Sequence, residues 1–258
     1  MKRWRAAGRD TPFDGRTVVE TSQLGAGYAG MPVVRQLDLR VDRGEIVALL
    51  GPNGAGKTTT LMTLAGLLPP VGGEARILGS PPGRRAHLLA RRGVALVPED
   101  RGLFPGLTVA EHLRLARPAG PADGDTGGRY AASVVEEHFP ELGRLMHRAC
   151  GLLSGGEQQM LAVCRALATR PAVLMVDEMS LGLAPKIAER LLSVLKRISA
   201  DQDMAVLLVE QHVHMALDVA DRGYVLSHGD VVLQGDASYL RENRAVLASA
   251  YLGGVALS

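Results

Sequence analysis

The sequence predicts an α/β protein built on a parallel sheet, and two observations support this prediction. Apolar runs recur along the 258-residue chain, at residues 46–50, 94–97, 173–176 and 205–209. These runs are continuous rather than alternating, which is typical of strands covered by helices on both faces. Segments with helical spacing, such as 186–199, separate several of the runs. Alternating strands and helices favour a parallel sheet.

The composition narrows the class of protein. Apolar residues make up 47% of the chain, which is enough for a full hydrophobic core. The formal net charge of +2 argues against a dedicated nucleic-acid binder. No apolar run approaches the roughly 18 residues that a membrane span needs. Cys150 and Cys164 lack metal-ligand spacing, so we expect buried or free thiols in a reducing compartment.

The chain begins with a basic stretch, residues 1–16, that has no apolar segment behind it. Its basic residues are Lys2, Arg3, Arg5, Arg9 and Arg16. We expect a flexible, solvated tail and not a secretory signal, with attraction to anionic lipid as the weaker alternative. We assign residues 17–254 to a single domain and 255–258 to a C-terminal tail.

The early part of the domain has a different pattern from its core. Turn signals at Gly44, 72–74 and Gly79 separate short strands, which indicates an N-terminal antiparallel β subdomain. Near the end, apolar residues 224–226 and 231–233 flank a Gly-containing turn, as in a β-hairpin.

The middle of the domain is mainly helical in character. We predict a helical subdomain over about residues 100–165. Residues 116–128 interrupt it and are rich in Pro, Gly and Asp. Since core strands resume afterwards, this interruption is a flexible loop and not a domain linker.

A glycine-rich loop follows the apolar run that ends at Leu50. It reads Gly51-Pro52-Asn53-Gly54-Ala55-Gly56-Lys57-Thr58-Thr59, and its first eight residues match G-x-x-x-x-G-K-[ST]. A helix-compatible run, 58–67, comes next. Backbone N–H groups of such a loop converge on phosphate oxygens. Lys57 would reach the β- and γ-phosphates, and the Thr58 hydroxyl would bind Mg²⁺. A glycine turn with a chance lysine is the alternative interpretation.

Two carboxylates end the apolar run at 173–176. Asp177 is the expected partner of Thr58 in binding Mg²⁺. Glu178 is placed to polarise a water for attack on the γ-phosphate, because a general base must be within reach of that water. Without the loop upstream, the pair would read as surface carboxylates at a strand end.

A second anion-binding pattern is Ser154-Gly155-Gly156-Glu157, at the predicted start of a helix. A serine hydroxyl and free N–H groups at a helix N-terminus attract phosphate. Taken alone, the pattern would be an ordinary helix cap. One protomer cannot use this second set of donors on its own nucleotide. The two patterns together predict an ATPase that works as a dimer.

The glycine-rich loop, the Ser154 segment and residues 173–178, in this order, resemble the ATP-binding subunit of an ABC transporter. The resemblance spans about residues 18–253. It implies a P-loop NTPase core of the ABC ATPase type with a parallel sheet, an N-terminal antiparallel β subdomain and a helical subdomain. It also implies bound ATP and Mg²⁺. The residues that close over the γ-phosphate of the other subunit are then Ser154, Gly155, Gly156 and Glu157.

The resemblance assigns roles to four further residues. Tyr28 matches the aromatic that stacks on adenine, although a core tyrosine is the alternative. Glu99 stands where the family has a Mg²⁺-sensing Gln, and a carboxylate still suits a hard cation. Gln211 stands at the position of the family's switch His, with His212 one place later. A Gln side chain can form a hydrogen bond with a γ-phosphate, but it cannot carry a proton or a positive charge there. We favour Gln211 in this catalytic role and keep His212 as the alternative.

Several segments narrow the resemblance to the LivF-type subunit of branched-chain amino acid importers. They are Pro98-Glu99, residues 180–185, residues 209–211 and residues 251–254. Two positions depart from the pattern, since Met179 replaces a Pro and His212 replaces an Asn. The resemblance implies a second ATPase subunit in a homo- or heterodimer, two integral-membrane permeases and an extracytoplasmic substrate-binding protein. It places the chain on the cytoplasmic side of the membrane, attached through the permeases.

Four alternatives stand beside an importer of branched-chain amino acids. The first is an importer ATPase for another small polar solute such as urea or amides, because such subunits do not contact the solute. A repair or translation ATPase on nucleic acid is disfavoured by the single cassette and the near-neutral charge. A P-loop kinase or GTPase leaves Ser154-Gly155-Gly156 unexplained. A non-catalytic nucleotide-binding module leaves Asp177 and Glu178 without a role.

Overall fold

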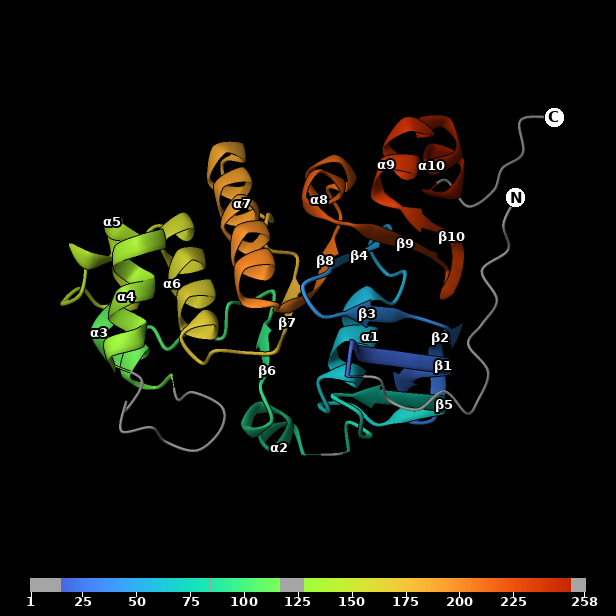
Figure 1. The fold of residues 1–258 in the computed structure, drawn as a ribbon, viewed down its shortest axis with the longest axis horizontal. Helices are drawn as coiled ribbons and strands as arrows, with labels where there is room; N and C mark the ends of the chain where they lie inside the picture. Colours follow the sequence, from blue (N-terminus) through green and yellow to red (C-terminus); the bar gives the residue numbers. More distant parts are fainter. Residues whose placement is uncertain (1–14, 84, 117–127, 252–258) are drawn as a thin grey trace.

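The computed structural model describes residues 15–83, 85–116 and 128–251. Helices α3 to α6 gather at one end of the molecule and the N-terminal sheet at the other (Figure 1). The strands are β1 (Thr17–Tyr28), β2 (Met31–Leu37), β3 (Arg40–Asp42), β4 (Ile46–Leu50), β5 (Pro70–Ile77), β6 (Val94–Val97), β7 (Val173–Asp177), β8 (Ala205–Glu210), β9 (Arg222–Ser227) and β10 (Asp230–Asp236). The helices are α1 (Lys57–Leu64), α2 (Ala86–Arg91), α3 (Val109–Arg114), α4 (Gly128–His138), α5 (Pro140–Gly143), η1 (Cys150–Leu152), α6 (Gly155–Leu167), α7 (Pro185–Gln202), α8 (Val213–Val219), α9 (Ala237–Glu242) and α10 (Arg244–Tyr251).

The larger sheet has the strand order β10-β9-β4-β8-β7-β6. All its pairings are parallel except that of β9 with β10, which is the predicted late hairpin. Every residue of β4, β7 and β8 is buried. Successive residues alternate between two hydrophobic cores, so that Val47 and Leu49 face one core and Ala48 and Leu50 the other. Burial on both faces explains the continuous apolar runs, and it confirms the predicted parallel core.

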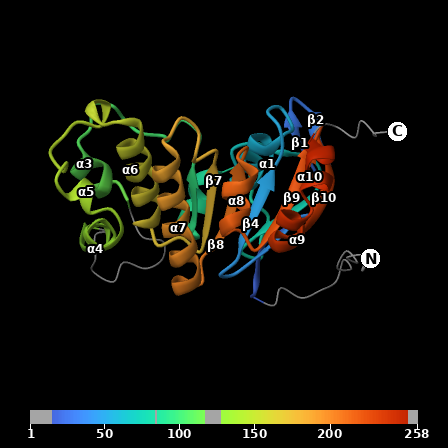
Figure 2. The ribbon, with the colours of Figure 1, turned by 90° about the horizontal axis from the view of Figure 1, so that it is seen from above.

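The smaller sheet confirms the predicted antiparallel β subdomain. In it β1 pairs with β2, β3 and β5, in each case antiparallel. Its buried residues join one face of the larger sheet in a single core, in which Val19 and Ile77 lie with Val47 and Val173. The two sheets therefore pack as layers, with α1 at their junction (Figures 1 and 2).

Helix ends differ slightly from the predicted ones. The run predicted at 58–67 is helical from Lys57 to Leu64 and ends before Gly66, which has φ +72°. The run predicted at 186–199 extends over Pro185–Gln202, with proline at its first turn and a left-handed Asp203 after it. In the part of the chain that the structure describes, no helix is both long and apolar enough to cross a bilayer.

The helical region contains α3, α4, α5 and α6, and α6 ends at Leu167, two residues beyond the predicted span of about 100–165. The predicted flexible loop at 116–128 falls mostly on residues 117–127, which lie outside the described residues. So do the predicted tails, apart from Gly15 and Arg16. The domain boundaries stay predictions. Cys150 and Cys164 are buried free thiols, as expected.

Candidate functional site

The glycine-rich loop runs from the carboxyl end of β4 into α1. Two of its glycines have no room for a side chain. A Cβ on Gly51 (φ +153°) would lie 2.3 Å from the Leu226 carbonyl oxygen, and one on Gly56 (φ +102°) would lie 2.2 Å from Val34 Cγ2. The loop therefore requires glycine at both positions. Its backbone conformation leads directly into the N-terminus of α1, where N–H groups attract phosphate.

Lys57 is buried at the start of α1 and its ammonium group lies against the loop. Its Nζ donates to the carbonyl oxygens of Gly51 (2.9 Å) and Pro52 (3.2 Å) and lies 3.3 Å from Glu178 Oε1. Thr59, next but one along the helix, is buried. The structure thus joins the loop and the carboxylate after β7, which lie far apart in sequence.

Thr58 and Asp177 lie side by side, as a shared cation would require. The Thr58 hydroxyl donates to Asp177 Oδ1 over 3.2 Å. Burial raises the pKa of Asp177 to about 6; the Thr58 bond opposes this, and the charges of Glu178 and Glu99 add to it. A carboxylate whose ionisation is this costly is stabilised by a nearby cation.

Within the described residues, no cluster of three or more His, Cys, Asp or Glu side chains is arranged to hold a metal ion. Mg²⁺ needs no such cluster, because it is usually bound by one or two protein oxygens together with waters and substrate phosphates. Thr58, Asp177 and the nearby charge of Glu99 fit that role. Glu99 itself is exposed in the turn after β6, whose last residue Val97 pairs with Val176.

Glu178 turns sharply away from β7. Its φ is +44°, and its N–H donates to the Val209 carbonyl oxygen on β8 over 2.9 Å. Its side chain is mostly buried beside Lys57. A residue with a side chain keeps such a backbone conformation only where the surroundings hold it there.

The segment after β8 carries the two candidate switch residues. Gln211 and His212 are both exposed. His212 Nδ1 lies 2.8 Å from the Ser180 hydroxyl, which also donates to the buried Glu210. Ser180 and Glu210 were not predicted as site residues. The available signal was an acidic residue, Glu210, ending an apolar strand as Asp177 does.

Tyr28 lies at the tip of the β1–β2 hairpin. It is 50% exposed and pairs with Met31 across the hairpin. The alternative interpretation as a core tyrosine is therefore wrong. The same hairpin contacts the phosphate loop through Val34, which limits the space at Gly56.

The segment from Ser154 to Glu157 opens α6, as predicted. Ser154 Oγ accepts from the Glu157 N–H (3.3 Å), and Glu157 Oε2 accepts from the Ser154 N–H (2.7 Å). These two bonds form a capping box. Figures 1 and 2 both place α6 with the helical elements, separated from α1 by β7 and α7. A Cβ on Gly155 would lie nearest Arg101 and one on Gly156 nearest Ile187, and neither neighbour belongs to the chain's own phosphate loop.

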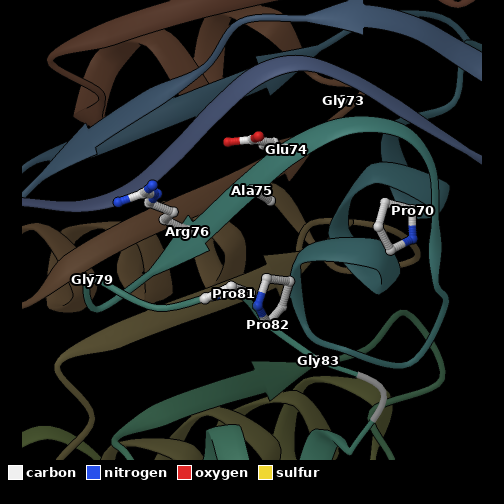
Figure 3. Close-up of a pocket in the computed structure, with 9 residues that line it drawn as sticks. All are labelled: Pro70, Gly73, Glu74, Ala75, Arg76, Gly79, Pro81, Pro82 and Gly83. Carbon is white, nitrogen blue, oxygen red and sulfur yellow. The ribbon is translucent and has the colours of Figure 1, made fainter. Parts of the chain in front are cut away.

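Several hollows in the described part of the chain lie outside this group of residues. One of 470 Å³ lies between α2, β6 and the helical elements, and its lining includes Leu96, Phe104, Leu115 and Ala166. Another of 620 Å³ lies along β5 (Figure 3). Its lining includes Pro70, Glu74, Arg76, Pro81 and Pro82, and none of these belongs to the predicted site.

Comparison with known proteins agrees with this geometry. A family model described as ABC transporter matches residues 34–180. The high-affinity branched-chain amino acid transport ATP-binding protein BraG of Pseudomonas aeruginosa is 39% identical, over 88% of this chain and 96% of its own. The probable branched-chain amino acid transport ATP-binding protein LivF of Archaeoglobus fulgidus is 36% identical, over 88% and 95%.

A solved structure of the ATP-binding subunit of an ABC transporter superposes with a TM-score of 0.77 at 30% identity, and it covers 93% of this chain and 100% of that one. With a family model matched over more than half of its length, the chain belongs to the ABC transporter family of ATP-binding proteins.

Proposed function

We propose that this chain is the ATP-binding and ATP-hydrolysing subunit of an importer for branched-chain amino acids. The observation that carries the proposal is the convergence of four side chains at the carboxyl edge of the parallel sheet: Lys57, Thr58, Asp177 and Glu178. The two curated relatives named above, whose printed names give branched-chain amino acid transport, support the choice of solute.

The loop Gly51–Thr58 binds the phosphates of ATP through its N–H groups, and Lys57 adds a positive charge at the β- and γ-phosphates. Thr58, Asp177 and Glu99 would hold Mg²⁺, which would supply positive charge beside the β- and γ-phosphates. Tyr28 stacks on the adenine.

Glu178 accepts the proton of the attacking water, since its carboxylate lies beside Lys57 where the γ-phosphate binds. Gln211, which follows β8 at the same sheet edge, hydrogen-bonds the γ-phosphate; His212 is the alternative residue for this contact. Leu50 at the end of β4 pairs with Glu210, so Gln211 comes directly after a residue adjoining the phosphate loop.

Ser154, Gly155, Gly156 and Glu157 bind the nucleotide of a second ATPase subunit, either another copy or a related chain. The start of α6 carries partial positive charge and N–H donors, which suit a γ-phosphate. Its separation from the chain's own loop supports this arrangement. Each of two nucleotides then lies between the subunits, and nucleotide affinity drives their closure.

Two integral-membrane permeases hold the chain at the cytoplasmic face of the membrane, and an extracytoplasmic substrate-binding protein delivers the solute. The hollow lined by Phe104 and Leu115 suits an apolar helical segment of a permease, because both side chains are more than half exposed.

The test is to purify the chain with its membrane partners and measure ATP-dependent uptake of labelled leucine, isoleucine and valine into vesicles. Uptake that requires ATP and is lost in Glu178→Gln supports the proposal. Uptake of urea or amides in place of these amino acids would mean that the transporter imports one of those solutes instead. Salt-sensitive DNA binding without membrane partners would overturn the transport function.

A further inference from the structure

Three polar side chains connect the segment after β7 with the segment after β8. The Ser180 N–H donates to Glu210 Oε1 over 2.9 Å, and the Ser180 hydroxyl donates to Glu210 Oε2 over 2.6 Å. His212 Nδ1 lies 2.8 Å from the same hydroxyl. We propose that Glu210, Ser180 and His212 form a brace of positioning residues that holds Glu178 at its working place. The inference rests on the proposed role of Glu178.

The turn that the brace holds is strained at its first residue. Glu178 has φ +44°, outside the region that residues with a side chain ordinarily adopt. Its carbonyl oxygen accepts from the Leu181 N–H, and the Ser180 carbonyl oxygen accepts from the Leu183 N–H. The turn is joined to β8 at two points, the Val209 carbonyl and the Glu210 carboxylate. If either connection is lost, Glu178 can leave its strained backbone conformation.

Burial of the Glu210 carboxyl at this position is energetically unfavourable, which argues that the residue has a specific role. It is only 1% exposed, and burial raises the pKa of its carboxyl against the effect of the Ser180 bonds. A buried carboxyl without partners is strongly unfavourable. Both of its oxygens accept from Ser180, so the residue is satisfied by the turn itself. Its burial is compensated only while the turn keeps this conformation.

The brace also fixes the ring of His212. The Ser180 hydroxyl donates its one proton to Glu210 Oε2, and its oxygen accepts from His212 Nδ1 in the tautomer that carries the ring proton there. In this arrangement Nδ1 is bonded to the turn, which holds the ring in place. His212 thus acts through Ser180, which leaves the phosphate contact to Gln211.

The experiment compares Ser180→Ala, Glu210→Gln and Ser180→Thr in the assembled transporter. The matched control is Ser199→Ala, which removes another buried serine hydroxyl whose bond goes to the Met204 carbonyl within the α7–β8 connection. The measurements are kcat and KM for ATP, together with hydrogen exchange at the Leu181 and Leu183 amides.

We expect Ser180→Ala and Glu210→Gln to lower kcat about 10- to 100-fold, as for a small misplacement of a catalytic group, while KM stays within about twofold. Exchange at both amides should accelerate. Ser180→Thr restores the hydroxyl and should recover most of kcat, and Ser199→Ala should leave kcat unchanged. If kcat and amide exchange in Ser180→Ala and Glu210→Gln equalled those in Ser199→Ala, the proposed brace would be contradicted. An unaltered chain without ATPase activity would instead contradict the proposed function, and amide exchange would still test the brace.

Discussion

The carboxyl edge of the parallel sheet and the start of α6 both carry phosphate-binding patterns, yet their contacts differ in kind. At the sheet edge, Thr58 bonds Asp177 across 119 residues of sequence, and Lys57 lies beside Glu178. At the start of α6, the side chains of Ser154 and Glu157 bond within one helical turn. The first region is a site assembled by the fold of one chain, whereas the second is a local cap that presents its donors outward.

This difference indicates that the two regions have separate roles in binding and hydrolysing nucleotide. Parallel strands bring their carboxyl ends to one edge, so residues from separate strands meet there without a partner. The capping box satisfies only the N–H groups of Ser154 and Glu157, so the start of α6 keeps other N–H donors for a ligand. We infer that the sheet edge performs chemistry on the chain's own nucleotide and that the start of α6 completes the site of the other subunit.

The sheet edge is tested most strongly by Glu178→Gln. We expect kcat for ATP in the assembled complex to fall about 10³-fold, since general-base catalysis contributes in this range, and ATP affinity to persist. Turnover assays and nucleotide-binding titrations measure the two effects. Glu189→Gln on the exposed face of α7 serves as the control and should behave as the parent. Undiminished turnover in Glu178→Gln would remove this residue from the reaction.

The start of α6 is tested by Ser154→Ala against Thr108→Ala. The second variant is a matched control, because Thr108 forms the same capping box with Glu111 at the start of α3. Both should destabilise the chain by about 1 kcal/mol through loss of a helix cap. Only Ser154→Ala should also lower turnover of the complex, about 10- to 100-fold, through a lost hydrogen bond to a charged phosphate. Equal ATP turnover in the two variants would mean that Ser154 only caps the helix and does not contact the nucleotide of the other subunit.

The sequence predicted the sheet edge well because its signals are local. The loop Gly51–Thr58 is a contiguous motif, and Asp177 and Glu178 directly end an apolar run. The partnership of Ser180 with Glu210 was missed because it joins residues 30 apart, and Glu210 reads from sequence as a solvated strand end. Helix α1 starts one residue earlier than predicted, after Gly56 in a left-handed backbone conformation that the sequence pattern does not reveal.

The cost of assembling the sheet edge is tested by Asp177→Asn without nucleotide. The folded pKa of Asp177, about 6, lies above its ordinary value of 3.8. As pH rises from about 4 to about 6, the unfolded chain therefore releases this proton first, and the carboxyl destabilises the fold fully above that window. We expect Asp177→Asn to be more stable than the parent by about 2 kcal/mol at pH 7.5 and equal to it at pH 4.

Denaturant unfolding at the two pH values measures the effect. Asp201→Asn, at an exposed position on α7, is the control and should change stability by less than about 0.5 kcal/mol at either pH. A parent that becomes more stable between pH 4 and pH 6 relative to Asp177→Asn would contradict the assignment. Such an outcome would mean that burial of the Asp177 carboxylate does not destabilise the fold.

The smallest effect is expected at Tyr28, which tests whether the chain's own site extends to the smaller sheet. Removing a stacking aromatic costs about 1–3 kcal/mol per base, so Tyr28→Ala should raise KM for ATP about tenfold with kcat unchanged. Tyr28→Phe keeps the ring and should match the parent. Met31→Ala, which alters the exposed cross-strand partner of Tyr28, controls for disturbance of the hairpin. If Met31→Ala raised KM as much, the hairpin would act through its packing on Gly56 and not through stacking, and the nucleotide site would end at the phosphate loop.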